Sequence, residues 1–104
     1  MELKFGGKLT KGDLLLIHAY GGLQMGIFVG FGRGTIQYYI PTWVINRYQY
    51  YKGKGLAPTF HKTYIYGSNT SDRAARITPE ILNSEDLNTY LEAIDILKQE
   101  NIIK

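Results

Sequence analysis

The chain has 104 residues, no cysteine and a formal net charge of +3, and this length suits one domain with its own hydrophobic core. The missing cysteines exclude disulfides, thiolate metal sites and cysteine nucleophiles, and no apolar run forms a signal peptide or approaches the roughly 20 residues of a membrane span. We therefore expect a single cytoplasmic domain over residues 1–104 that does not associate with a membrane.

The first half of the chain consists of short β-prone runs separated by glycine turns. Residues 14–20 form an apolar run that predicts a buried strand. In the next run, the odd-numbered residues from Met25 to Phe31 are expected on one face, and the glycines between them favour a curved strand. Residues 35–40 alternate in the manner of a third strand, until Pro41 is expected to end its pairing.

Two more strands are expected downstream. Residues 43–51 are rich in aromatic and β-branched side chains, which favour strands. A turn at residues 52–55 precedes a further candidate strand over residues 59–66. If residues 47–52 and 60–66 pair as a hairpin, their rings and cations can share one face of the sheet.

The periodicity then changes to that of helices. Thr78, Pro79 and Glu80 predict a helix of about one turn, because threonine is a good N-cap and proline suits the first helical position. A longer helix is predicted after Asn83 or Ser84, where apolar side chains recur at spacings of three and four.

Five short, strongly bent strands followed by a C-terminal helix indicate a mainly β protein of the α+β class. Closing the strands into a small barrel over residues 8–67 removes exposed strand edges. Residues 78–104 then form a C-terminal helical segment of the same single domain.

The turn and strand chemistry of the first strands resembles that of a known fold. A Lys-Gly-Asp turn at residues 11–13 opens an apolar strand, and the strand at residues 26–31 is bounded by glycines and followed by a Gly-Arg-Gly turn. Over about residues 8–41 this pattern resembles the opening of SH3-like barrels, which include nucleic-acid-binding and peptide-binding modules. The short, tyrosine-rich chain also resembles small bacteriophage proteins in general character.

Charged and aromatic residues are unevenly distributed. Residues 1–66 carry a net charge of +6 and residues 67–104 a net charge of −3. Between residues 14 and 71 there is no Asp or Glu, yet this segment contains five basic residues and twelve of the fourteen aromatic ones. Cations and flat rings without carboxylates suit a polyanion with exposed bases. The candidate contact residues are Arg33, Arg47, Tyr48, Tyr50, Tyr51, Lys52, Lys54, Lys62, Tyr64 and Tyr66.

Each of these features also has a structural explanation. Tyrosine favours strands and fills amphipathic cores, so packing alone accounts for each ring, although not for the missing acids. Residues 32–34 have the glycines of an anion-binding nest and equally those of an ordinary hairpin turn. His18 and His61 match no metal pattern, and no nucleophile motif is present, so we expect no cofactor and no catalysis.

The sequence therefore predicts a non-enzymatic domain that binds single-stranded or irregular nucleic acid. A module that binds or inhibits a host protein, encoded for example by a bacteriophage, is the alternative, because tyrosine, tryptophan and arginine are also favoured at protein hot spots. A sponge for small anionic nucleotides at residues 32–34 is a third hypothesis.

Overall fold

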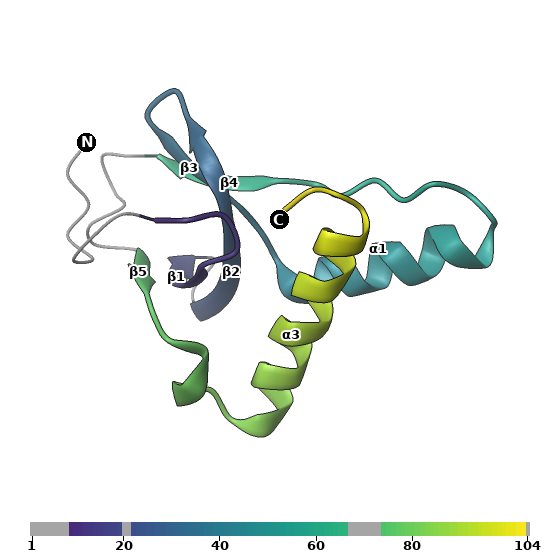
Figure 1. Cartoon of the computed structure of the whole chain (residues 1–104). Helices are drawn as coiled ribbons and strands as arrows, with labels where there is room; N and C mark the ends of the chain where they lie inside the picture. Colours follow the sequence, from purple (N-terminus) through teal and green to yellow (C-terminus); the bar gives the residue numbers. More distant parts are fainter. Residues whose placement is uncertain (1–8, 20–21, 67–73, 104) are drawn as a thin grey trace.

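The computed structural model describes residues 9–19, 22–66 and 74–103 (Figure 1). The elements in chain order are β1 (Leu14–Ala19), β2 (Gly22–Gly32), β3 (Thr35–Tyr39), α1 (Pro41–Gly53), β4 (Thr63–Tyr66), β5 (Ala74–Arg76), the one-turn 3-10 helix η2 (Pro79–Ile81) and α3 (Ser84–Gln99).

The strands form one antiparallel sheet in the order β4-β3-β2-β1-β5. The prediction of an α+β fold with five strands and a C-terminal helix is confirmed. The sheet of the described residues is open, with β4 and β5 at its two edges, so these strands do not themselves close the expected barrel. β5 had no counterpart among the predicted strands.

A β-bulge bends β2 and changes the face on which its end lies. Phe28 pairs with Tyr38 and Gly30 with Gln37, so Val29 is an extra residue that the partner strand does not match. The bulge reverses the alternation beyond it. The Phe31 ring therefore meets the Phe28 ring, at 5.0 Å between centroids, and the prediction that Phe31 shares a face with Met25 is wrong.

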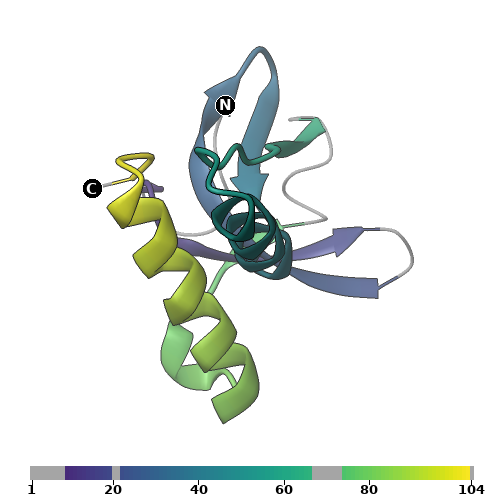
Figure 2. The same ribbon diagram turned by 90° about the vertical axis from the view of Figure 1, so that its right-hand side faces the viewer.

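Both faces of the sheet bury apolar side chains. One face packs against α1 and α3 through a core made of Leu14, Ile27, Tyr39, Val44, Tyr90, Ala93, Ile96, Leu97 and Ile103. The other face curls over a second core made of Leu15, Ile17, Phe28, Ile36, Tyr38, Ile40, Ile65 and Ala74. Figure 2 shows α1 nearly end-on, with α3 beside it on the same side of the sheet.

The segment predicted as a fourth strand, residues 43–51, is helical, because it lies within α1. Pro41 occupies the start of this helix, where its missing N–H costs nothing. Pro41 and Val44 are buried, and Ile45 and Tyr48 pack against the same core. These four positions have the spacing of one helical stripe, so burial overrides the strand propensity of the individual side chains.

The end of α1 also changes the strand that follows. Gly55, with φ +69°, ends the helix in a left-handed cap: its N–H donates to the carbonyl of Lys52, and that of Leu56 donates to the carbonyl of Tyr51. The chain then runs back along α1, and strand pairing begins only at Thr63. The proposed hairpin between residues 47–52 and 60–66 is therefore wrong, because β4 pairs with β3.

The C-terminal elements follow the predicted boundaries. Thr78 is the N-cap residue of η2, although its side chain makes no capping hydrogen bond. Asn83 caps α3 by accepting a 2.8 Å hydrogen bond from the Asp86 N–H. Asn101, in a left-handed conformation, ends the last turn.

Candidate nucleic-acid interface

Six of the ten predicted contact residues lie on α1 or directly behind it. They are Arg47, Tyr48, Tyr50, Tyr51, Lys52 and Lys54. The C-terminal half of this helix extends beyond the sheet (Figure 1). The predicted site is therefore concentrated on one projecting helix, not on a sheet surface.

Each of the three cations on α1 or at its C-cap lies against a tyrosine four positions away in the sequence. The Arg47 guanidinium carbon is 5.4 Å from the centroid of the Tyr51 ring. The corresponding distance is 5.3 Å for the Lys52 ammonium over Tyr48 and 5.1 Å for the Lys54 ammonium over Tyr50. Residues four apart are neighbours on a helix surface, and cations within about 6 Å of a ring are attracted to it.

These three pairs lie on different sides of the helix. The Tyr48 and Lys52 pair lies on the side of α3, where the Tyr48 hydroxyl contacts Gln99 at 3.5 Å. The Tyr50 and Lys54 pair projects outward, and Tyr50 is 59% exposed, the largest exposed fraction among the large hydrophobic side chains of α1. The Lys54 ammonium lies over the Tyr50 ring and the Tyr51 ring meets it edge-to-face at 5.3 Å between centroids, so a flat ligand would stack on the part of the ring that these two groups leave exposed.

The third pair, Arg47 and Tyr51, holds the segment that follows α1 against the helix. Arg47 donates to the Thr59 carbonyl at 2.7 Å through Nε, and to the Thr59 hydroxyl at 3.0 Å and the Tyr51 hydroxyl at 3.1 Å through its terminal nitrogen. The guanidinium thus fastens the returning segment to α1. Because most of its donor capacity is used inside the protein, Arg47 is less able to bind a phosphate than the two lysines.

The three cations form no ion pair with a described carboxylate. In residues 9–19, 22–66 and 74–103, no carboxylate lies within 4.0 Å of the Arg47, Lys52 or Lys54 cations, and the ion pair that does form joins Arg76 to Asp13 at 3.9 Å. The negative end of the helix dipole amounts to about half a charge, and its effect falls off beyond the last turn. Three full positive charges therefore outweigh it.

The other four predicted residues lie elsewhere. Arg33 is exposed in the turn between β2 and β3. The tip of this hairpin lies away from α1 in both views (Figures 1 and 2). Lys62 precedes β4, and Tyr64 is 56% exposed on that edge strand. The side chain of Tyr66 lies outside the described part of the structure. The structure thus brings together the residues of α1 but not all ten.

One exposed aromatic residue of α1 was missed as a contact residue. Trp43 lies in the first turns of α1 and is 48% exposed. The signal that could have found it is the helical spacing of Trp43, Tyr50 and Lys54, which places all three on one side of a helix. This spacing carries meaning only once the segment is recognised as helical.

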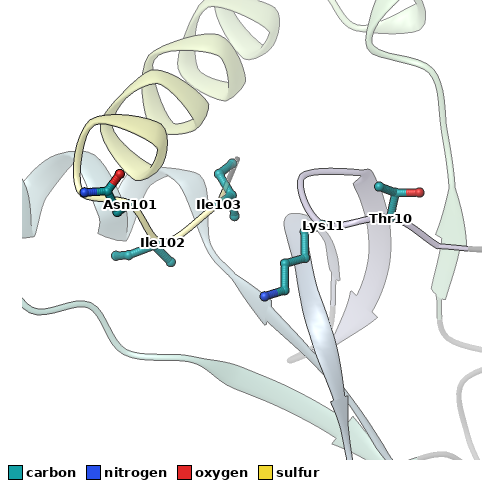
Figure 3. Close-up of a pocket in the computed structure, with 5 residues that line it drawn as sticks. All are labelled: Thr10, Lys11, Asn101, Ile102 and Ile103. Atoms are coloured by element: carbon teal, nitrogen blue, oxygen red, sulfur yellow. The ribbon is translucent and has the colours of Figure 1, made fainter.

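A cavity lies apart from α1 (Figure 3). It has a volume of about 360 Å³ and lies between the turn that opens β1 and the end of the chain. Its lining consists of Thr10, Lys11, Asn101, Ile102 and Ile103. The Lys11 side chain extends from the turn toward the isoleucines. None of the predicted contact residues lines this cavity.

A smaller cavity of about 220 Å³ shares Lys11 and Ile103 with the first. Tyr90 lines it and donates a 2.6 Å hydrogen bond to the Gly12 carbonyl. Burial raises the pKa of the Tyr90 phenol, and the nearby Asp13 carboxylate raises it further. Tyr90 is thus neutral at physiological pH and ties α3 to the first turn.

Comparison with known proteins identifies no relative: no family model, no curated protein and no solved structure matches this chain. Across the described ranges, neither long helix has the length and hydropathy needed to cross a bilayer. The same residues contain no group of three or more His, Asp or Glu side chains placed to hold a metal ion. The surface of α1 remains the candidate interface.

Proposed function

We propose that this protein is a non-enzymatic cytoplasmic domain that binds single-stranded or irregular RNA or DNA through α1. The observation that carries the proposal is the set of three cation and tyrosine pairs on one projecting helix, with no described carboxylate within 4.0 Å of the three cations. Phosphates require cations and unpaired bases require flat surfaces, and this helix offers both within three turns.

The expected energies favour a ligand that uses rings and charges together. Stacking of one base on an aromatic ring is worth about 1–3 kcal/mol, as measured by alanine substitution. Each phosphate neutralised on a single strand adds about 0.7 to the slope of log affinity against log salt concentration. Lys52 and Lys54 are exposed, and Arg47 contributes its charge although its donors are occupied.

Packing explains part of this arrangement but not all of it. Tyr48 packs against the core, and Lys52 stabilises the negative end of the helix dipole, so both have structural reasons to be present. The outward Tyr50 and Lys54 pair has weaker structural reasons: Lys54 is the C-cap residue of α1, and the Tyr50 ring meets the Tyr51 ring edge-to-face at 5.3 Å between centroids. Both side chains are nevertheless exposed, and a ligand that uses the ring and the ammonium together accounts for them better than folding alone.

Fluorescence anisotropy of labelled single-stranded DNA and RNA at two salt concentrations tests the proposal. Three cations predict a slope of roughly −2 in a plot of log affinity against log salt concentration. Lys54→Gln should reduce the slope by about 0.7 and weaken binding at low salt. Lys98→Gln is the matched control. It removes the same charge, and Lys98 is also an exposed lysine near the end of a helix, α3.

Two results would contradict the proposal. The first is no binding of either strand at low salt. The second is equal weakening by Lys54→Gln and Lys98→Gln, which would show a response to net charge without a site on α1. In the first case a protein partner becomes the better hypothesis. A protein that is captured from a lysate and stays bound after nuclease treatment would support it.

A further inference from the structure

The outward face of α1 carries a second exposed ring in line with Tyr50. Trp43 and Tyr50 are seven residues apart, and seven residues of an α-helix turn through two revolutions less roughly 20°. The two rings are 48% and 59% exposed. Both lie opposite the buried stripe of Pro41 and Val44, so neither is needed for the core.

The remaining rings of α1 are engaged within the protein. The Tyr51 hydroxyl is hydrogen-bonded to Arg47 and Thr59, and Tyr48 packs against the core and contacts Gln99. Trp43 and Tyr50 are therefore the rings of α1 most accessible to a ligand. The helix itself contains no acidic residue, so nothing on it repels an anion that lies along this face.

The separation of the two rings suits a strand of a few nucleotides. A rise of 1.5 Å per residue places their backbones about 10 Å apart along the helix axis. This distance corresponds to about three stacked nucleotides at roughly 3.4 Å each. Lys54 lies one turn beyond Tyr50 on the same face, where a phosphate of the same strand can meet its ammonium.

We infer that Trp43 and Tyr50 form a two-ring stacking track for the unpaired bases of a single nucleic-acid strand; this inference rests on the proposed function. The strand runs along the outward face of α1, and Lys54 neutralises one of its phosphates. It does not cross the sheet edge at Tyr64. A duplex, whose bases are already stacked in pairs, cannot use the two rings in this way.

Trp43 is the only tryptophan of the chain, so its emission reports directly on this site. We would titrate the protein with an unlabelled oligothymidine of eight nucleotides and, in parallel, follow the anisotropy of the same strand carrying a dye. The emission of Trp43 should change with the same midpoint as the anisotropy. A strand of two nucleotides, too short to reach both rings, should bind at least tenfold more weakly.

Substitutions test which residues the nucleic-acid strand contacts. Trp43→Leu should weaken binding about tenfold, whereas Trp43→Phe, which keeps a stacking ring, should retain most of the affinity. Tyr64→Leu is the control for the sheet edge, since Tyr64 is as exposed as Tyr50, and it should change affinity less than twofold. Circular dichroism checks that each variant is folded.

The outcomes separate the inference from the function on which it rests. Binding by anisotropy with unchanged Trp43 emission and an unaffected Trp43→Leu variant would overturn the stacking track while leaving nucleic-acid binding intact. A larger loss for Tyr64→Leu than for Trp43→Leu would place the strand on the sheet edge and would also overturn the inference. No binding by anisotropy would overturn the proposed function together with the track.

Discussion

Replacement of Gly26 by alanine tests the packing at the centre of the sheet. A Cβ atom at this position would lie 2.6 Å from Ile17 Cδ1 and 2.8 Å from Tyr38 Cδ2. Both of these side chains are fully buried, so neither can move into solvent to make room. Gly26 is thus present because the Tyr38 ring lies directly over its backbone, and not because the chain turns there.

The cost of this substitution can be judged from its contacts. Overpacking of a well-packed core costs about 1–3 kcal/mol, and two close contacts at once place Gly26→Ala toward the upper end of that range. Replacing glycine by alanine in a strand recovers about 0.5–1 kcal/mol of backbone entropy. We therefore expect a net loss of about 2 kcal/mol in the free energy of unfolding, which lowers Tm by about 10 °C in a domain of this size.

Urea unfolding followed by circular dichroism measures this loss, with the m value expected to stay unchanged. Gly30→Ala is the matched control in the same strand, because a Cβ there would meet no atom within 4 Å. The control should be neutral or slightly stabilising. If Gly26→Ala were as stable as the wild type, or if both variants lost the same free energy, the packing described for Tyr38 would be refuted.

Substitutions at three further positions test other parts of the structure. Asn101 has φ 60°, so Asn101→Ala should lose about 1 kcal/mol in urea unfolding and Asn101→Gly should lose nothing; equal losses would argue against the left-handed cap. Tyr90→Phe removes the hydrogen bond to Gly12 and should cost about 1 kcal/mol at pH 8. Because burial raises the pKa of Tyr90 in the folded state, wild-type stability is retained below pH 10 and falls as pH rises through the raised pKa, and this decline should be smaller in Tyr90→Phe. Arg47→Lys cannot keep all three hydrogen bonds and should accelerate hydrogen exchange in the segment that returns from α1; unchanged exchange would show that this anchor is dispensable.

The strands before Pro41 and the C-terminal helix could be predicted because several local signals agree. Residues 14–17 are continuously apolar, residues 35–39 alternate, and glycines separate the strands. At α3, a capping asparagine, acidic residues in the first turn and a helical stripe all indicate the same element. The sheet face predicted for Phe31 was wrong because a β-bulge has no reliable signature in the local sequence.

α1 could not be predicted from composition because its side chains favour strands. Tyrosine, tryptophan, valine and isoleucine dominate residues 43–51, and the stripe that begins at Pro41 and Val44 is too short to outweigh them locally. Burial against α3 makes this segment helical, and the residues of α3 follow some forty positions later in the sequence. β5 spans only three residues, and pairing with β1 defines it more than its own sequence does.

The candidate site was predicted by residue type but not by geometry. The acid-free, tyrosine-rich segment was visible in the sequence, and six of its predicted residues do cluster. The spacing of four between Tyr50 and Lys54, and between Tyr48 and Lys52, was visible too. In a strand these even-numbered residues would share one face, whereas on a helix the two pairs lie on different sides.

The most direct test of the central claim is a map of the binding surface by nuclear magnetic resonance. Amide signals of the protein would be followed during titration with an oligothymidine of eight nucleotides at low salt. We predict that the largest shifts fall on residues 43–54 and decline when salt is added. Shifts confined to the β2–β3 hairpin, to β4 or to the cavity beside Lys11, or no shifts at all, would contradict the assignment of binding to α1.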